Sequence, residues 1–408
     1  MNRLKSKIIY KIKRNIKLKD NIKIFLMIIQ FPVVLAAFIS SKFYKKNIWL
    51  IGETGNDAKD NGLAFFSFLV KEHAEINTIY YISGQTAAAD HVRNLGPTVE
   101  TNSFRHKVAF MSAKYVLSTH DGYSIPFFGA NWREFKLAYG WLVPEKKFVF
   151  LNHGVNKDDM VENTKYKRTK FDFYVTTTED EYREMTSSKY GYPLNDVVKT
   201  GLARYDFLLA NRVSSKKKYI VFMPTWRYYL ADVDDEAFVQ STYYKTIYSF
   251  LHDPRLDTIL HEKKLQLYFF PPHHEIQKRI HLFDLSGKTI QSINTEETKF
   301  SDVVTNCSMM ITDYSSVIFD FAYLYKRTAY FQFDLNEYRE GQYKQGYFDY
   351  DEDGFGPIYS EENDLVNEIE RASLIDFRIE EKYKNRISKT FTWHDRKNCE
   401  RLFNILIK

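Results

Sequence analysis

Two series of short apolar runs, each run followed by a helical stretch, constrain this sequence more than any other feature. The first series contains residues 47–52, 78–83, 115–119, 147–151, 171–176 and 197–200. Alternating strands and helices are typical of parallel sheets covered by helices, and near-continuous apolar character indicates strands that are buried on both faces. We therefore predict an α/β fold.

The second series begins after a polar, lysine-rich stretch at 211–218, which has the composition of an interdomain linker. Its expected strands are 219–223, 265–270, 288–293, 308–312 and 328–333. A chain of 408 residues is also too long for one compact core of ordinary size. The pattern predicts two Rossmann-like domains that face a cleft, residues 47–212 and 213–408, with the last helix packing back on the first domain.

Residues 1–46 form a segment of different character. They contain twelve Lys or Arg and one acidic residue, Asp20, and they become apolar over 24–39. That apolar stretch is interrupted by Gln30 and Pro32 and is shorter than the roughly 20 residues that span a bilayer. Such a segment is typical of an anchor on an anionic membrane surface, here the cytoplasmic face. A secretory signal and an ordinary core helix are the alternatives.

Several function classes find no support in the sequence. Cys307 and Cys399 are the only cysteines, too few for a disulfide framework or a four-ligand zinc site, which favours a reducing compartment. There is no Gly-x-Gly-x-x-Gly and no Walker sequence, so dehydrogenases and nucleoside triphosphatases of those types are not indicated. Because the basic charge is confined to the N-terminal segment, we expect a membrane surface and no nucleic acid as its partner.

The first candidate site follows the expected strand 147–151. His153 and Gly154 stand just after this strand, in a polar loop that continues with Asn156, Lys157 and Asp158. In open α/β sheets, ligands bind beyond the carboxyl ends of the strands. An imidazole can take a proton from a hydroxyl at neutral pH, so we predict a general base at this histidine. A histidine satisfied by a backbone carbonyl is the alternative.

The second candidate site follows the expected strand 265–270. Pro271, Pro272, His273, His274 and Glu275 stand there, and one of the two histidines can donate to a phosphate oxygen as charge develops on a leaving group. Adjacent residues rarely point at one ion, and no second group of ligands is evident, so we predict no metal site. No cofactor is firmly implied, and a requirement for a divalent cation stays open.

A third candidate site joins the expected strand 308–312 to a helix. Thr312 and Asp313 lead to Ser315 and Ser316, and either serine as N-cap, with free backbone N–H groups, would make an anion site suited to a pyrophosphate. Plain helix capping is the alternative.

A fourth candidate site follows the strand at 219–223. Arg227 is expected to clamp a phosphate through its planar fork, and Trp226 offers a stacking face. A solvated arginine is the alternative.

In their order along the chain, these segments resemble the CDP-glycerol glycerophosphotransferase family, which builds teichoic acids and related capsule polymers. The resemblance covers about residues 47–403. It rests on Ile48-Trp49, Lys59-Asp60-Asn61-Gly62, His153-Gly154 with Lys157-Asp158, Thr200-Gly201 with Arg204, Pro224 to Arg227, His273, Thr312 to Ser316, and Phe319-Asp320. Pro271, His274 and Ala203 depart from the family pattern. Asp334 and Glu337 resemble another family segment that reaches the ribose or polyol of the donor, although a solvated helix explains them equally well.

The resemblance implies the two-domain glycosyltransferase-B architecture, with the nucleotide held mainly by the second domain. It implies that His153 activates an acceptor hydroxyl, that His273 lies near the donor pyrophosphate, and that Ser315 and Ser316 hold phosphate oxygens beside Arg227. The expected reaction moves glycerol phosphate from CDP-glycerol, or a similar CDP-polyol, to a lipid-linked glycan and releases CMP. A CDP-ribitol donor, a nucleotide-sugar 2-epimerase and a non-catalytic membrane-associated binding protein are the alternatives.

Overall fold

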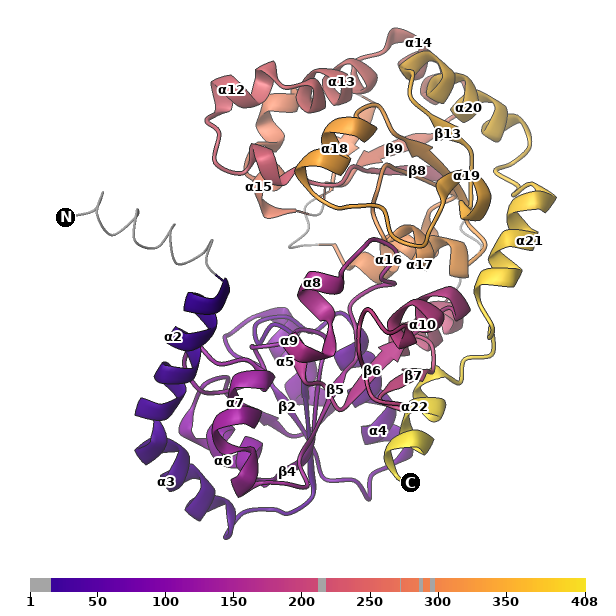
Figure 1. Cartoon of the computed structure of the whole chain (residues 1–408). Coiled ribbons are helices and arrows are strands. Elements are labelled where there is room, and N and C mark those ends of the chain that lie inside the picture. The colour runs from indigo at the N-terminus through magenta and orange to yellow at the C-terminus, as the bar shows by residue number, and fades with distance from the viewer. Residues whose placement is uncertain (1–15, 212–217, 272, 286–288, 294–297) are drawn as a thin grey trace.

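The computed structural model describes residues 16–211, 218–271, 273–285, 289–293 and 298–408, with side chains from Asn21 onward. It contains two parallel sheets, each in a lobe of its own (Figure 1). The basic residues before Ile16 and most of the predicted linker, 212–217, lie outside the described residues.

The first sheet has seven strands in the order β3-β2-β1-β4-β5-β6-β7, and all neighbours are parallel. The strands are β1 (Ile48–Gly52), β2 (Thr78–Tyr81), β3 (Thr98–Val99), β4 (Ala113–Ser118), β5 (Lys147–Phe150), β6 (Phe173–Thr176) and β7 (Val197–Lys199). Every residue of β1 and β2 is buried, as their continuous apolar character predicted. In the register, Ser118 pairs with Phe150, so the loops that leave β4 and β5 start side by side.

The second sheet has six parallel strands in the order β10-β9-β8-β11-β12-β13. They are β8 (Tyr219–Met223), β9 (Gln266–Phe269), β10 (Ile290–Ser292), β11 (Met309–Thr312), β12 (Arg327–Phe331) and β13 (Ile358–Tyr359). Thr312 pairs with Met223, and Phe222 pairs with Phe269, so β8, β9 and β11 end at one level. The predicted α/β class with two parallel sheets is confirmed.

Helices cover both faces of the first sheet. One face carries α2 (Ile16–Ile29), α3 (Phe31–Ser41), α6 (Phe104–Ser112), α7 (Trp132–Tyr139) and α10 (Glu179–Thr186), and the other carries α4 (Asn61–Glu72), α5 (Ala87–Leu95), α11 (Ala203–Ala210) and α22 (Asn398–Leu406). The connections contain α8 (Val161–Thr164), α9 (Tyr166–Thr169) and the 3-10 helix η1 (Gly140–Leu142).

The second sheet is covered in the same way. One face carries η2 (Tyr228–Leu230), α12 (Asp235–Gln240), α13 (Thr242–Leu251), α14 (Pro254–Glu262), α15 (His274–Gln277), η3 (Ile280–Phe283) and α20 (Glu362–Leu374). The other carries α16 (Phe300–Asn306), α17 (Ile318–Tyr323), α18 (Leu335–Gly341), α19 (Tyr350–Asp353) and α21 (Glu381–Thr390). Tyr205 and Leu208 of α11 belong to this core, so α11 packs against both domains.

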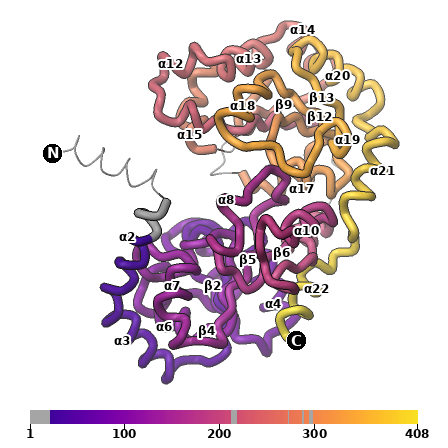
Figure 2. The backbone as a smooth tube through the Cα atoms, viewed as in Figure 1, coloured from indigo at the N-terminus to yellow at the C-terminus, as the bar shows by residue number. Residues whose placement is uncertain are grey.

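The chain crosses from the second domain back to the first at its C-terminal end. α21 lies along the second domain, and α22 lies against the first (Figure 2). The Tyr115 hydroxyl of β4 donates to the backbone oxygen of Leu406 at 2.6 Å, and the Asp206 carboxylate of α11 accepts from the backbone N–H groups of Asn398 and Cys399. The helix α22 therefore packs on one face of the sheet of the first domain.

α2 and α3 pack on α7 and α6 at the outer side of the first domain. Among the described residues, no single helix is long and apolar enough to cross a membrane, and the segments Asn21–Ile29 and Phe31–Ser41 reach that length and composition only as a pair bent by 60°. The break falls where the sequence interrupts its apolar stretch, because Pro32 in the first turn of α3 has no N–H to continue α2. Exposed apolar side chains on this pair are Phe25, Ile28, Ile29, Phe31, Val33 and Ile39.

Candidate active site

His153 follows the carboxyl end of β5, and its side chain is exposed. Asn152 before it has a φ of 60°, a left-handed conformation that asparagine tolerates, and its side-chain oxygen accepts from the backbone N–H of His153 at 2.9 Å. The Nδ1 atom of His153 lies 3.3 Å from the backbone oxygen of Thr119. Because a carbonyl oxygen can only accept, Nδ1 carries the proton, and the neutral ring has its lone pair on Nε2.

A buried carboxylate, Glu181 of α10, fixes the loop that follows β5. Its Oε1 accepts from the backbone N–H of Asn156 at 2.8 Å and from Nδ2 of Asn152 at 3.3 Å, while its Oε2 accepts from the backbone N–H of Thr177 at 2.7 Å. The N-cap of α10, Thr178, holds the backbone of Glu181 through a 3.1 Å hydrogen bond. Burial raises the pKa of Glu181 to about 7.

Arg204, in the first turn of α11, joins the two domains beside this loop. Its guanidinium forms two bonds to Asp320 of α17, at 2.6 and 2.8 Å, and Nη1 also donates to Asp60 at 2.7 Å and to the backbone oxygen of His153 at 3.1 Å. The side-chain oxygen of Asn61 accepts from the backbone N–H of Arg204 at 3.0 Å. Three predicted site residues, Asp60, Asn61 and Arg204, thus lie together in one interdomain network.

Lys157 takes part in a second contact between the domains. Its buried ammonium lies 2.5 Å from one oxygen of Asp158, and Arg339 of α18 donates to the other oxygen at 2.8 Å. The same ammonium lies 5.3 Å from the ring centroid of Tyr350. Burial lowers the pKa of Lys157. Lys157, a predicted site residue, therefore helps to hold the loop against the second domain.

His273 lies on the second domain, beyond the carboxyl end of β9, and its ring stacks on Trp226 with centroids 5.3 Å apart. As N-cap of α15, its Nδ1 accepts from the backbone N–H of Glu275 at 3.2 Å, so the neutral ring carries its proton on Nε2. Burial lowers the pKa of His273, which favours this neutral form. His274 is exposed and pairs with Glu275 at 3.0 Å, so it is His273 that packs into the domain.

The phosphate clamp expected at Arg227 is replaced by a buried ion cluster. Arg227 is fully buried, and its fork is bidentate to Asp334 at 2.8 and 2.9 Å, with a third bond to Asp313 at 2.8 Å. Asp313 also accepts from the backbone N–H of Thr225 at 2.9 Å. Burying an arginine requires carboxylate partners, so Arg227 and Asp334 neutralise each other at the strand ends and the guanidinium is not exposed to a ligand. Trp226 is likewise covered, by the ring of His273.

Ser315 and Ser316 lie between β11 and α17, and both are partly exposed. The predicted serine N-cap is wrong, because Val317 is the N-cap of this six-residue helix, and the Ser315 hydroxyl accepts from its backbone N–H at 3.3 Å. Ser316 faces the first domain, since a Cβ added to Gly154 would lie 3.2 Å from its Oγ. Thr312 is buried and donates to a backbone oxygen of β8 at 2.7 Å.

The remaining predicted residue, Glu337, is exposed on α18. Within the described ranges, no group of three or more His, Cys, Asp or Glu is arranged to hold a metal ion. The sequence left open whether the protein requires a divalent cation, and the described part of the chain contains no such cluster that could bind one.

His120 is a further residue beside His153 that was not predicted from the sequence. Its ring stacks on that of His153, with centroids 4.9 Å apart and an angle of 15° between the planes. Burial, together with the neighbouring His153, lowers the pKa of His120 to about 4, so it is neutral at neutral pH. A signal was present, because His120, Asp121 and Gly122 follow the expected strand 115–119 just as His153 follows its own.

The model of a known protein family matches most of this chain. The family model described as CDP-Glycerol:Poly(glycerophosphate) glycerophosphotransferase matches residues 33–408. The minor teichoic acid biosynthesis protein GgaB of Bacillus subtilis (strain 168) is 27% identical over 377 residues, which cover 90% of this chain and 40% of that protein. The chain spans about half the length, or less, of the curated relatives it matches.

Solved structures share the fold. The wall teichoic acid polymerase TagF has a TM-score of 0.67 at 17% identity, covering 96% of this chain and 98% of that chain. The Methanocaldococcus jannaschii UDP-GlcNAc 2-epimerase in complex with UDP-GlcNAc and UDP has a TM-score of 0.54 at 15% identity, covering 88% and 99%. At these identities the structures establish the architecture alone. The match of the family model over residues 33–408 goes further, and by it the chain belongs to the CDP-glycerol:poly(glycerophosphate) glycerophosphotransferase family.

Proposed function

We propose that this protein transfers glycerol phosphate, or a related polyol phosphate, from a CDP-activated donor to a hydroxyl of a lipid-linked cell-wall or capsule glycan. The hydroxyl oxygen attacks the β-phosphorus, the bond from that phosphorus to the bridging oxygen breaks, and CMP leaves with the bridging oxygen. Membership of the family supports this class of reaction. The attacking oxygen must lose one proton, so the site needs a base on the acceptor side.

The opposite tautomers of two histidines carry this proposal. His153 holds its proton on Nδ1 against the backbone oxygen of Thr119, which leaves the Nε2 lone pair to accept a proton. His273 uses Nδ1 to accept from the backbone of Glu275, so its Nε2–H is a donor for a phosphate oxygen. One histidine is thus prepared as a general base and the other as an electrostatic stabiliser, which are the two roles that the reaction requires.

Positioning supplies the rest of the catalysis. Phosphoryl transfer depends on alignment and charge stabilisation more than on covalent help from the protein. The approach of Gly154 to Ser316 brings the base-bearing loop to the serines of the second domain. We assign Ser315 and Ser316 to the donor phosphates, with Asp313 and Thr312 holding the strand end that carries them.

The names of similar proteins support CDP-glycerol as the donor. One TagF structure, 16% identical to this chain, comes from crystals soaked with CDPG, and the Staphylococcus aureus (strain NCTC 8325 / PS 47) relative is named a teichoic acid glycerol-phosphate transferase. We carry this donor over to the present chain as a proposal. CDP-ribitol is the alternative polyol donor for the same site.

We also propose that the protein lies on the cytoplasmic face of the membrane. α2 and α3 expose apolar side chains, and η1, next to α7, adds Trp141, which is 69% exposed. The basic residues of segment 1–46 would meet anionic lipids. A lipid-linked acceptor would then reach the first domain from the surface on which the protein lies.

The test is CMP release by the detergent-extracted protein, supplied with CDP-glycerol or CDP-ribitol and a lipid-linked disaccharide acceptor. We expect acceptor-dependent release with one donor, and a fall of about 100-fold or more in His153→Ala, because a positioned base contributes that much. The matched control is His261→Ala, which removes an exposed histidine of α14. This control should transfer at the rate of the unchanged protein.

The other possible results would contradict the proposed transfer reaction. Folded protein that releases no CMP with either donor would exclude the reaction. Release that is independent of the acceptor would indicate a hydrolase, and turnover of UDP-N-acetylglucosamine alone would indicate an epimerase.

A further inference from the structure

A cavity of about 770 Å³ opens in the first domain beyond the carboxyl ends of its strands. Thr54 follows β1, Ser83 follows β2, Thr101 follows β3 and Asp121 follows β4, and all four line the cavity. The sheet order β3-β2-β1-β4 changes direction between β1 and β4. Open α/β sheets bind ligands at such a switch point. Since His153 and Ser316 do not line it, this cavity is distinct from the transfer site.

The cavity has a surplus of positive charge. Lys23 of α2 and Lys107 of α6 line it, and Asp121 is the one acidic residue among its described lining residues. The Lys107 ammonium donates to the backbone oxygen of Asn102 at 2.6 Å, and within the described ranges no carboxylate lies at ion-pair distance from it. Burial lowers the pKa of Lys107. An anionic ligand would therefore find a cation that the protein itself leaves without a counter-ion.

The carboxylate of Asp121 is directed into the protein. It accepts from the backbone N–H of Trp132 at 2.9 Å, and burial raises its pKa to about 6. The ammonium of Lys23 donates to the side-chain oxygen of Asn131 at 2.9 Å and lies 3.9 Å from Glu134. Asn56, Asn102 and Asn131 add amide groups to the lining. Amides and hydroxyls beside two cations suit a ligand that carries both phosphate and hydroxyl groups.

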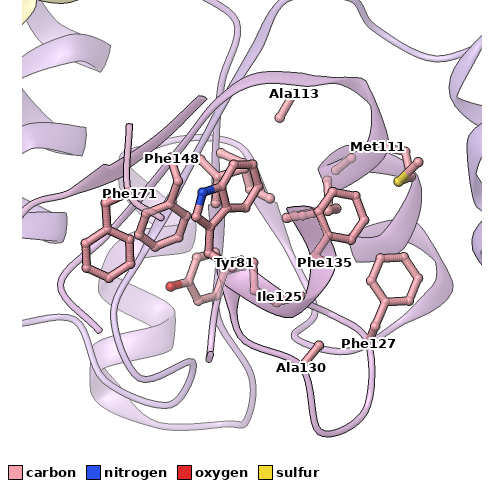
Figure 3. Close-up of a cluster of buried hydrophobic side chains, with 14 of the residues drawn as sticks. Tyr81, Met111, Ala113, Ile125, Phe127, Ala130, Phe135, Phe148 and Phe171 are labelled. Carbon is pink, nitrogen blue, oxygen red and sulfur yellow. The ribbon is translucent and has the colours of Figure 1, made fainter. Parts of the chain in front are cut away.

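The wall of the cavity next to α2 and α3 consists of buried apolar side chains. Ile125, Phe127 and Ala130 line the cavity and are also buried in the core of the first domain (Figure 3). At the break between α2 and α3, Gln30 donates to the backbone oxygen of Phe128 at 3.0 Å and accepts from its N–H at 2.9 Å. Lys23 of α2, and Gln30 at the break before α3, therefore border the cavity.

The opposite side of the cavity leads toward the general base. Tyr123 lines the cavity, and its ring centroid lies 6.1 Å from that of His120. The ring of His120 stacks in turn on His153. A molecule held in the cavity thus lies between the apolar helices and the histidine that faces the acceptor.

We propose that this cavity binds an anionic, hydroxyl-rich phosphodiester segment of the acceptor, with Lys23 and Lys107 against its phosphate oxygens. The proposal rests on the transferase function proposed above, and it adds what that function lacks, a place that holds the acceptor while its terminal hydroxyl reaches His153. The apolar anchor of the acceptor would stay at α2 and α3.

The test measures binding without turnover, so that it does not depend on transfer activity. The full chain in detergent is titrated calorimetrically with a soluble tri(glycerol phosphate) and with neutral triglycerol. We expect Lys23→Gln and Lys107→Gln each to weaken binding of the trimer by about tenfold or more, since a charge-assisted hydrogen bond is lost. Lys107→Arg, which keeps the charge, should restore most of the affinity, and binding of triglycerol should be the same in all variants.

Two control variants locate the effect. Lys114→Gln removes an exposed lysine at the opposite end of β4, and it should bind the trimer normally. Ser316→Ala should bind the trimer normally and CDP-glycerol less tightly. Equal trimer affinity in the lysine variants and the unchanged protein, or loss in Ser316→Ala alone, would overturn the proposal.

Vesicles separate the two sources of such a phosphodiester. The lysine variants should bind phosphatidylglycerol vesicles as the unchanged protein does, whereas a loss that matches the loss of trimer binding would assign the cavity to a phospholipid headgroup and overturn the acceptor site. If the protein shows no transfer but the lysine variants still lose the trimer, the cavity stands and the transferase function falls.

Discussion

The two domains each present a histidine beyond the end of a strand, but they fix it by different chemistry. His153 stacks on His120, and its loop is held by the buried carboxylate of Glu181, with which no Lys or Arg pairs in the described part of the chain. His273 stacks on Trp226, next to an Arg227 that two aspartates neutralise. One histidine, His273, therefore lies beside an ion cluster, whereas the loop of the other, His153, is held by a carboxyl group that titrates.

Breaking the ion cluster should have the largest effect. Arg227→Ala leaves two buried aspartates, Asp313 and Asp334, without their cation, which costs about 3–5 kcal/mol in the free energy of unfolding. Urea unfolding followed by circular dichroism measures this loss. We expect the second domain to unfold first, because β8, β11 and α18 meet at the cluster.

An exposed ion pair provides the control for that experiment. Arg183 is 70% exposed and pairs with Glu179 at 3.2 Å, so Arg183→Ala should change the free energy of unfolding by less than about 1 kcal/mol. Equal losses in the two variants would mean that the cluster around Arg227 contributes no more than a surface pair.

The first domain should differ in its response to pH. In the folded protein Glu181 keeps its proton up to about pH 7, whereas an unperturbed glutamate releases it near 4.5. The unfolded state therefore binds fewer protons between these values, and the contribution of Glu181 to stability falls as pH rises through them. Between pH 5 and pH 7.5, the stability difference between the unchanged protein and Glu181→Gln should shift by about 2 kcal/mol.

Urea unfolding at several pH values measures this shift. Glu162→Gln, which neutralises an exposed carboxylate of the same domain, should follow the pH profile of the unchanged protein. A constant difference between Glu181→Gln and the unchanged protein over the whole range would show that Glu181 does not titrate there. Glu181 would then not make the stability of the first domain depend on pH, and the proposed difference between the two domains would be wrong.

The strands were predictable because their signal is local. Continuous apolar runs gave β1 and β8 within one residue of their bounds, whereas the two-residue edge strands β3 and β13 were missed. An edge strand this short has no periodicity of its own, and only its neighbour in the sheet defines it. The bend between α2 and α3 was signalled by Gln30 and Pro32, which interrupt the apolar stretch.

The positions of the two candidate histidines were predictable because both residues follow strands. His153 and His273 stand beyond strand ends in the sequence as they do in the fold. The partners of Arg227 lie 86 and 107 residues away, so the sequence does not reveal that its charge is already neutralised. Glu181 lies on α10, and it accepts from the backbone N–H of Asn156, which stands 25 residues before it in the sequence. The roles of Arg227 and Glu181 depend on contacts between residues that are far apart in the sequence, and no local sequence pattern shows such contacts.

The smallest expected effect separates stacking from proton transfer at His153. His120→Asn removes the ring that packs on His153, and transfer should fall about two- to tenfold, since an aromatic pair contributes about 0.5–1.5 kcal/mol. His120→Phe keeps a ring without nitrogen, and it should recover most of the rate. CMP release under subsaturating acceptor measures both variants. If His120→Phe transfers as slowly as His120→Asn, a nitrogen of His120 is required, and the first domain would use a pair of histidines where the second uses one histidine on a tryptophan.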